Sequence, residues 1–152
     1  MNLSNSSINR TIQHARNDSF DINITSTGTD TLINTNATFY EQNLTSSMTL
    51  NSSWISINPN FTSTIAAGSS RTYTVNLSIP IRTDPGNYSG TINVTSNGGN
   101  KYLNLTVTVP SNGSWYLVPS TNFSYNRSFA LTSAGEIGNF TLVNLGNINM
   151  SF

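Results

Sequence analysis

The sequence has no cysteine and very little charge. Without cysteine, neither a disulfide nor a thiolate metal site can form. Charged side chains make up 8% of the 152 residues, where an ordinary globular domain has about 25%. The six basic and six acidic side chains cancel to a net charge of zero. Because no excess of Lys and Arg is available to neutralise phosphates, nucleic-acid binding has no electrostatic basis here.

Long apolar runs are also missing. The run "WYLV" at 115–118 is far too short to span a bilayer, and "MNLSNSSINR" at 1–10 has no apolar signal-peptide core. We therefore expect no membrane span in this chain. Disorder is not expected either, because disordered chains combine high net charge with few aromatic and β-branched residues, whereas this chain is 36% hydrophobic and 10% aromatic.

Apolar and polar residues alternate along most of the chain, which predicts β-strands. Asn97-Gly98 lies between two alternating runs and predicts a hairpin turn, and Pro85-Gly86 suits a type II turn. Residues 9–17 are the only patch that is mildly compatible with a helix. Short strands at this spacing predict an all-β fold, an antiparallel sandwich. The expected strands lie near residues 6–12, 18–26, 31–41, 47–57, 71–79, 88–96 and 101–109.

Asparagine, serine and threonine supply the polarity that charge does not. The chain has 24 Asn and 44 Ser plus Thr, and random placement of these residues would give about seven N-x-[ST] sequons. The sequence contains 18 of them. They are at Asn2, Asn5, Asn9, Asn17, Asn23, Asn36, Asn43, Asn51, Asn60, Asn76, Asn87, Asn93, Asn104, Asn112, Asn122, Asn126, Asn139 and Asn149.

The position of these sequons in the expected strands favours N-glycosylation. Residues i and i+2 share one face of a strand, so at 93–95 and 104–106 the Asn and the hydroxyl point outward around an inward apolar residue. Turn and strand composition account for the seven sequons of a random arrangement. The excess predicts covalent N-linked glycans that cover a neutral surface and obstruct unwanted strand pairing.

The segment "DPGNYSGTINV" at 84–94 resembles the start of strand F in immunoglobulin-like domains. The resemblance implies that Tyr88 forms a tyrosine corner and that Gly90 stands in the place of the second cysteine. The longer pattern over residues 50–110 is similar to Ig-like modules strung in tandem in archaeal and bacterial cell-surface glycoproteins, of surface-layer, filament or adhesin type. An Ig-like β-sandwich at the cell surface or outside the cell is what this resemblance implies.

Internal matches suggest that a second unit begins near residue 115. Residues 5–12 match 122–129 at an offset of 117, and residues 21–32 match 139–150 at an offset of 118. A rival match sets "SWISINP" against "SWYLVP", about 61 residues apart, so both periods stay open.

We accordingly expect an Ig-like domain over 1–110, a linker over 111–114 and an incomplete second β unit over 115–152. Three strands are too few for a stable sandwich. The second unit is then either part of a longer tandem array or is completed by a neighbouring subunit.

No catalytic, cofactor or metal site is predicted. His14, the only histidine, lies in a polar segment and is expected to be solvated. Asp18 and Asp21 could contribute oxygens to a calcium site, but their spacing favours capping or loop roles. Trp54 could stack on a sugar or lie in the core, and we expect it to be partly buried.

The sequence therefore predicts a structural subunit of an extracellular assembly, a filament or a surface layer, rather than an enzyme. Subunits would associate through strand pairing or complementation by residues 115–152, with subunit contacts at Phe123, Phe129, Phe140 and Leu142. The expected partner is another copy of the chain, and surface glycans are a further possible partner. The alternative is an adhesin or carbohydrate-binding repeat of a larger secreted protein. No cofactor is expected other than the covalent glycans.

Overall fold

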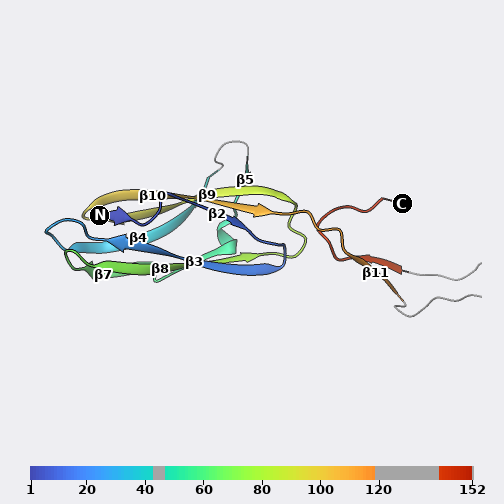
Figure 1. Cartoon of the computed structure of the whole chain (residues 1–152), viewed down its shortest axis with the longest axis horizontal. Helices are drawn as coiled ribbons and strands as arrows, with labels where there is room; N and C mark the ends of the chain where they lie inside the picture. The colour runs from blue at the N-terminus through green and yellow to red at the C-terminus, as the bar shows by residue number, and fades with distance from the viewer. Residues whose placement is uncertain (43–46, 119–140, 152) are drawn as a thin grey trace, which may run out of the picture.

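The computed structural model describes residues 1–42, 47–118 and 141–151 (Figure 1). Strands joined by turns make up this part of the chain, with one short 3-10 helix, η1 (Ser52–Trp54). The strands are β1 (Asn2–Leu3), β2 (Ser7–Thr11), β3 (Arg16–Thr25), β4 (Leu32–Glu41), β5 (Met48–Thr49), β6 (Ile55–Asn58), β7 (Phe61–Ile65), β8 (Ser70–Ile79), β9 (Gly86–Ser96), β10 (Gly99–Val109), β11 (Trp115–Val118) and β12 (Thr141–Asn144).

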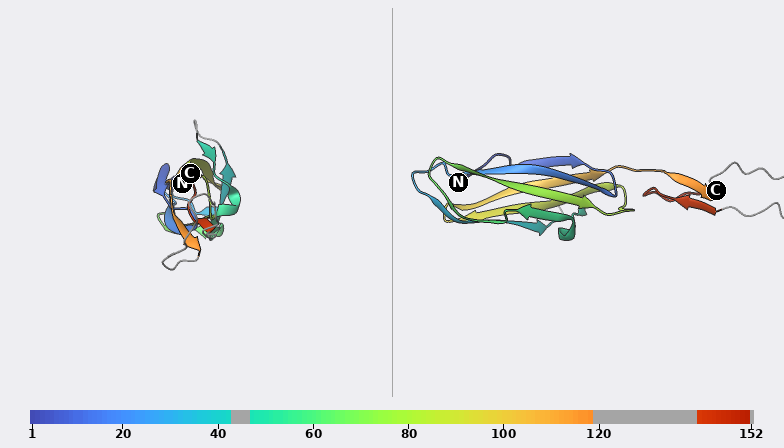
Figure 2. Two further views of the ribbon diagram at one scale, coloured as in Figure 1. Left: turned by 90° about the vertical axis from the view of Figure 1, so that its right-hand side faces the viewer. Right: turned by 90° about the horizontal axis from the view of Figure 1, so that it is seen from below.

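Two sheets pack face to face in an elongated sandwich (Figures 1 and 2). One sheet has the order β1-β3-β8-β6, and the other has the order β2-β10-β9-β4-β7, with β5 also paired to β9. Neighbouring strands are antiparallel except for the parallel pairs β2–β10 and β5–β9. The predicted all-β, Ig-like sandwich is confirmed.

The chain crosses between the sheets along both sides of the sandwich. Strands β1 and β2 follow one another but belong to different sheets, and so do β6 and β7, on either side of the cis Asn58–Pro59 peptide. The outer strands are consequently only two, five, four and five residues long. Short outer strands offer little backbone for pairing with another sheet.

The core lies between the two sheets and follows the alternation in the sequence. In β8, Tyr73, Val75, Leu77 and Ile79 point inward and are buried, while the residues between them are exposed or half-buried. Burying a side chain of this size contributes about 1.5–3 kcal/mol relative to leaving it in water. The other strands contribute inward residues in the same way: Phe20, Ile22, Ile24, Ala37, Ile92, Val94, Leu103, Leu105, Val107 and Val109.

Two features of the Ig-like resemblance appear in this core. The Tyr88 hydroxyl donates a hydrogen bond to the Asp84 carbonyl oxygen at 2.8 Å, so the predicted tyrosine corner is confirmed. At Gly90, an added Cβ would lie 2.2 Å from Cζ of Phe39 and 3.1 Å from the Tyr40 carbonyl oxygen. The Phe39 ring therefore fills the space beside this position, and only glycine leaves room for it.

Two local predictions were wrong. The strand expected over 47–57 is divided into β5, η1 and β6, because the Asn51 side chain accepts a hydrogen bond from the Ser53 amide at 2.8 Å and starts a helical turn. The turn expected at Pro85-Gly86 does not form, because Pro85 lies in a bend and Gly86 already begins β9. Residues 9–17, which are mildly compatible with a helix, instead contain the end of β2, which pairs in register with β10, and a turn at Ala15 (φ 57°) into β3.

Strands β11 and β12 form a separate two-stranded antiparallel sheet, the C-terminal hairpin, with Leu117 opposite Leu142. The hairpin extends beyond one end of the sandwich, opposite the end where the N-terminus lies (Figures 1 and 2). Among the residues described, no helix is long and apolar enough to cross a membrane.

Candidate functional site

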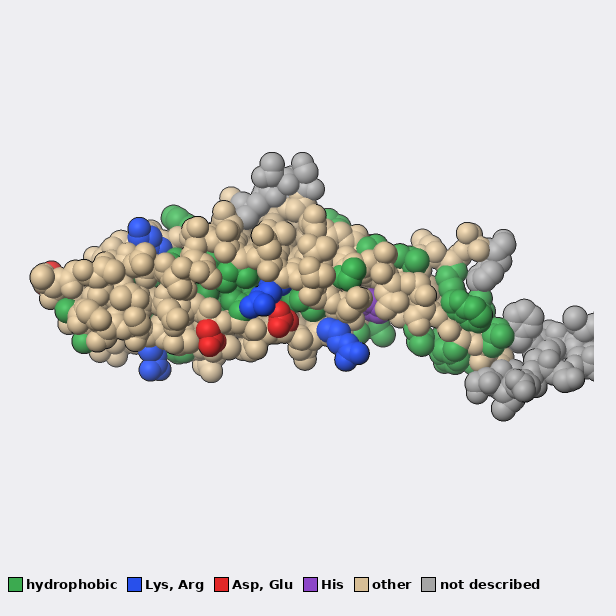
Figure 3. Space-filling model, in the orientation of Figure 1, with side chains coloured by type: hydrophobic (Ala, Val, Ile, Leu, Met, Phe, Trp, Pro, Cys, Tyr) green, Lys and Arg blue, Asp and Glu red, His purple; other side chains and the backbone are tan. Residues whose placement is uncertain are grey.

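The C-terminal hairpin carries an exposed apolar surface. Trp115 is 56% exposed, and Tyr116, Leu117 and Val118 are exposed beside it. Leu145 and Ile148, in the loop after β12, are exposed as well. These side chains form the apolar patch at the far end of the molecule in Figure 3. A continuous apolar patch of this kind marks an interaction surface in soluble proteins.

A buried asparagine connects this hairpin to the sandwich. Asn147 is only 7% exposed. Its amide nitrogen Nδ2 donates hydrogen bonds to the carbonyl oxygens of Thr83 at 2.9 Å and Pro110 at 3.0 Å. Its Oδ1 accepts one from the Asn112 backbone N–H at 2.7 Å. One side chain thus satisfies three backbone groups from two other segments, which fixes the loop after β12 against the end of the sandwich.

We call the contact that Asn147 makes with Thr83, Pro110 and Asn112 the joint. His14 lies beside it, and the prediction that His14 is solvated was wrong. The side chain is 8% exposed. Its Nδ1 accepts a long hydrogen bond from the Arg82 backbone N–H at 3.4 Å, and its Nε2 lies 3.3 Å from Nδ2 of Asn112. The neighbours of His14 in sequence are polar, but the turn before β3 places the ring under segments that come from about 70 and 100 residues further along the chain.

The predicted glycosylation sites are almost all at the surface. The structure describes 14 of the 18 sequon asparagines, of which 12 are exposed, and Asn93 and Asn112 are half-buried. Asn43, Asn122, Asn126 and Asn139 lie outside the described residues. Three exposed sites lie on strands where a hydroxyl of the neighbouring strand donates to the side-chain oxygen. These pairs are Thr72 to Asn23 at 2.7 Å, Thr108 to Asn87 at 2.8 Å and Thr91 to Asn104 at 3.4 Å.

Such hydrogen bonds orient the side chain in a way that suits N-glycosylation. The neighbouring hydroxyl holds Oδ1, whereas the sugar would be attached to Nδ2. Asn112 is the opposite case, because its Nδ2 faces the His14 ring and the residue is half-buried. At Asn93, Oδ1 is buried and has no hydrogen-bond partner among the described residues.

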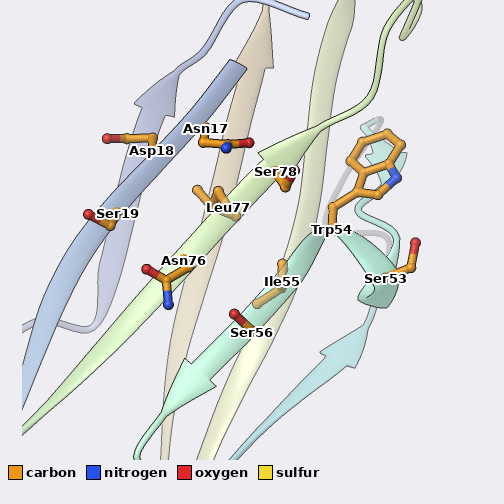
Figure 4. Close-up of a pocket in the computed structure, with 10 residues that line it drawn as sticks. All are labelled: Asn17, Asp18, Ser19, Ser53, Trp54, Ile55, Ser56, Asn76, Leu77 and Ser78. Carbon is orange, nitrogen blue, oxygen red and sulfur yellow. The ribbon is translucent and has the colours of Figure 1, made fainter. Parts of the chain in front are cut away.

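A shallow depression of about 510 Å³ lies on the outer face of the β3–β8–β6 sheet (Figure 4). Hydroxyl and amide side chains line most of it, with Trp54 next to Ser53 at one end. Trp54 is half-buried, as expected, with its ring centroid 5.3 Å from that of Tyr88 at an interplanar angle of 59°. Asp18 is the only titratable side chain in the lining.

The two carboxylates considered for calcium have other partners. Both lie within β3 and not in a loop, so the expected loop roles were wrong. Asp18 forms an ion pair with Arg10 at 3.7 Å, and Asp21 accepts a hydrogen bond from the Thr74 hydroxyl at 2.7 Å. Within the described ranges no group of three or more metal-ligating side chains occurs.

Of the four predicted subunit contacts, only Leu142 can be placed. It lies in β12, half-buried and opposite Leu117. Phe123, Phe129 and Phe140 lie outside the described residues. The sequence analysis missed the exposed side chains of β11, although "WYLV" was visible as an apolar run, and it missed Asn147, which nothing in the sequence distinguishes from other loop asparagines.

No family model and no curated protein sequence matches this chain. Solved structures do match its fold. The Escherichia coli chaperone DraB aligns with a TM-score of 0.52 and 9% identity over 72% of this chain. The Pseudomonas aeruginosa CupB2 chaperone aligns at 0.51 and 10% over 70%. A family 123 glycoside hydrolase from Clostridium perfringens aligns at 0.51 and 17% over 68%.

These alignments cover 55% of DraB, 54% of CupB2 and 23% of the hydrolase, so the chain spans about half the length of the two chaperones. Both chaperones and the hydrolase contain a sandwich of this kind beside further structure. At these identities the likeness concerns the fold alone, and the chain has an Ig-like β-sandwich fold.

Proposed function

We propose that this chain is a structural subunit of an extracellular, N-glycosylated surface assembly, a filament or a surface layer, and that subunits associate through strands of residues 115–152. The observation that carries the proposal is the exposed apolar hairpin. Strands β11 and β12 are four residues each, and a two-stranded hairpin of this size is marginal in water on its own. Contact with another polypeptide would bury Trp115 and its neighbours and so stabilise the hairpin.

The sides of the sandwich are largely polar. Its outer strands are at most five residues long, β1 covers only Ile24 and Thr25 of β3, and the outward positions are largely Asn, Ser and Thr. Glycans on the exposed asparagines would hinder contact along the sides of the sandwich and keep a surface without net charge in solution. Association would then be confined to the hairpin. The assembly is assigned no catalytic activity, and its place is at or outside the cell surface.

Electron cryomicroscopy of the native material tests the proposal. Ordered filaments or a lattice, with extra density at exposed asparagines, are expected. Trp115→Ser should abolish assembly while the sandwich stays folded by circular dichroism. Tyr102→Ala is the matched control, because Tyr102 is 58% exposed but lies on β10 of the sandwich, and this variant should assemble normally. Normal assembly of the Trp115→Ser variant would refute the role of the hairpin.

The depression beside Trp54 favours a second candidate, a carbohydrate-binding repeat of a larger secreted protein. Its hydroxyl and amide lining could hydrogen-bond to sugar hydroxyls, and the exposed part of the Trp54 ring could stack on a sugar face. In that case the native protein would be dispersed and would bind immobilised glycans. Trp54→Phe should weaken this binding, and Tyr102→Phe should leave it unchanged.

A further inference from the structure

The C-terminal hairpin repeats the first strand pair of the sandwich. The sequence match at an offset of 118 sets Leu142 in the place of Ile24. Ile24 pairs with Leu3 of β1, and Leu142 pairs with Leu117 of β11. Both pairs are antiparallel. In each, a short preceding strand (β1 or β11) pairs with the strand that takes part in the sequence match (β3 or β12). β12 therefore corresponds to the end of β3. β11 takes the place of β1, although it lies four residues further from its partner along the chain than the offset of 118 would set it.

The loop that follows each pair supports the same correspondence. The Ser26 hydroxyl donates to the Asp30 carbonyl oxygen at 2.9 Å, and Nδ2 of Asn144 donates to the Ile148 carbonyl oxygen at 2.8 Å. Donor and acceptor are four residues apart in both cases, and the two bonds are again offset by 118. The rival period of about 61 sets β11 on residues 54–57, most of which belong to β6, but it sets β12 on residues 80–83, which lie between β8 and β9 and not in a strand. It therefore accounts for only one strand of the hairpin.

Comparison with β3 shows that β12 has no second neighbouring strand among those the structure describes. In the sandwich, the second edge of β3 is covered by β8, with Ile24 opposite Arg71 and the Ser26 N–H donating to the Ser69 carbonyl oxygen at 3.0 Å. Strand β12 pairs only with β11 among the strands that the structure describes.

The free edge of β12 can be assigned to particular backbone groups. The Leu145 N–H donates to the Ser114 carbonyl oxygen at 2.8 Å, on the side of β11. Because successive amides of a strand point to opposite sides, the N–H groups of Leu142 and Asn144 point to the other edge.

We propose that this edge of β12 binds an extended strand of another polypeptide chain with the pattern of β8. The incoming strand runs antiparallel to β12, with its residue equivalent to Arg71 opposite Leu142. Its apolar residues alternate as Tyr73, Val75 and Leu77 do in β8. The β8 of this chain cannot serve, because β3 already pairs with it along its whole length, on the edge that would face β12. The inference rests on the proposed function and names the strand that the assembly uses.

A synthetic peptide of residues 69–80 tests the proposal directly. It carries a fluorophore and is titrated with the full chain, and anisotropy reports binding. Saturable binding is expected. A peptide of identical composition, in which Tyr73, Val75 and Leu77 are each exchanged with the polar residue that follows, should bind at least tenfold more weakly, because these apolar side chains then face away from the core side of the hairpin.

Two substitutions of Leu142 distinguish the contribution of the backbone N–H to peptide binding from that of the side chain. Leu142→Ala shortens the side chain but keeps the N–H, and it should weaken binding only moderately. Leu142→Pro also removes the N–H on the free edge, which β11 does not use, and it should reduce binding at least tenfold below Leu142→Ala. Proline is tolerated at such an edge position. The Trp115 emission spectrum checks that both variants keep the hairpin.

Three results would overturn the inference: no binding of the 69–80 peptide, equal binding of the exchanged peptide, or equal affinities of Leu142→Pro and Leu142→Ala. The proposed function is tested separately by microscopy of the native material. Filaments without peptide binding would support the proposed assembly and refute the proposal that β12 binds a strand with the pattern of β8. Peptide binding without filaments would support the strand-binding edge of β12 and refute the proposed assembly.

Discussion

Replacing Asn147 by alanine should detach the C-terminal hairpin from the sandwich without unfolding the sandwich. Three hydrogen bonds depend on this side chain: those to the carbonyl oxygens of Thr83 and Pro110, and that from the Asn112 backbone N–H. The substitution leaves all three backbone groups without their partner. None of them belongs to the ladders that hold the two sheets together.

The size of the effect follows from these bonds. A net contribution of about 0.5–1.5 kcal/mol for each hydrogen bond gives about 1.5–4.5 kcal/mol for the three. Since about 1.4 kcal/mol changes an equilibrium constant tenfold, the joint should open about ten to a thousand times more often. Asn147→Asp should be worse than alanine, because a carboxylate cannot donate to the two carbonyl oxygens and repels them.

Hydrogen exchange measures this opening at individual amides. The Asn112 amide, bonded to Asn147, and the Gly146 amide, bonded to Ser114 at 3.1 Å, should exchange faster in the variant. Amides of the β9–β10 ladder should be unchanged. Asn100→Ala, an exposed asparagine outside any sequon, is the control. Unchanged protection at Asn112 would refute the role of Asn147 as the joint.

Three further predictions concern the sandwich and its surface. Gly90→Ala should lower the free energy of unfolding by about 1–3 kcal/mol, measured in urea, because the added methyl meets the Phe39 ring; an unchanged midpoint would contradict the close packing. Site-resolved glycopeptide mass spectrometry should find a glycan on Asn104 and none on Asn112, whose amide faces His14, and the reverse pattern would count against the geometry. Burial raises the pKa of Tyr73, so the folded state holds this proton more tightly. Stability is then complete below about pH 10, the ordinary tyrosine value, and falls as pH rises above it; Tyr73→Phe should reduce this fall.

The sandwich could be predicted from the sequence because its strands are long and alternate strictly. Residues 73–79 and 103–109 bury every second side chain, and this alternation can be recognised in the sequence without knowing the partner strand. The role of Tyr88 was predicted through the resemblance of residues 84–94 to Ig-like domains, and its bond to Asp84 spans four residues. Residues 47–57 misled the prediction, since the Asn51 side chain competes locally with the ladder and breaks an alternating run.

The candidate site was harder to predict because its parts meet only in three dimensions. His14, Asn112 and Asn147 come together from positions up to 133 residues apart. Each is polar and lies outside an alternating apolar run, so nothing in the sequence signals burial. A second unit from residue 115 stays a prediction, and the partner of β11 became evident only from the register of Leu117 with Leu142.

The parallel pairing of β2 with β10 has a consequence for a sandwich that is pulled from its two ends. The N-terminus and the hairpin lie at opposite ends of the sandwich (Figure 1), and β2 pairs with β10 from Ser7 opposite Asn104 to Thr11 opposite Thr108. Tension along the long axis would drag these strands past each other lengthwise. The hydrogen bonds between them would then be loaded together instead of opening one after another, so the sandwich should resist stretching more strongly than its low charge and lack of disulfides suggest.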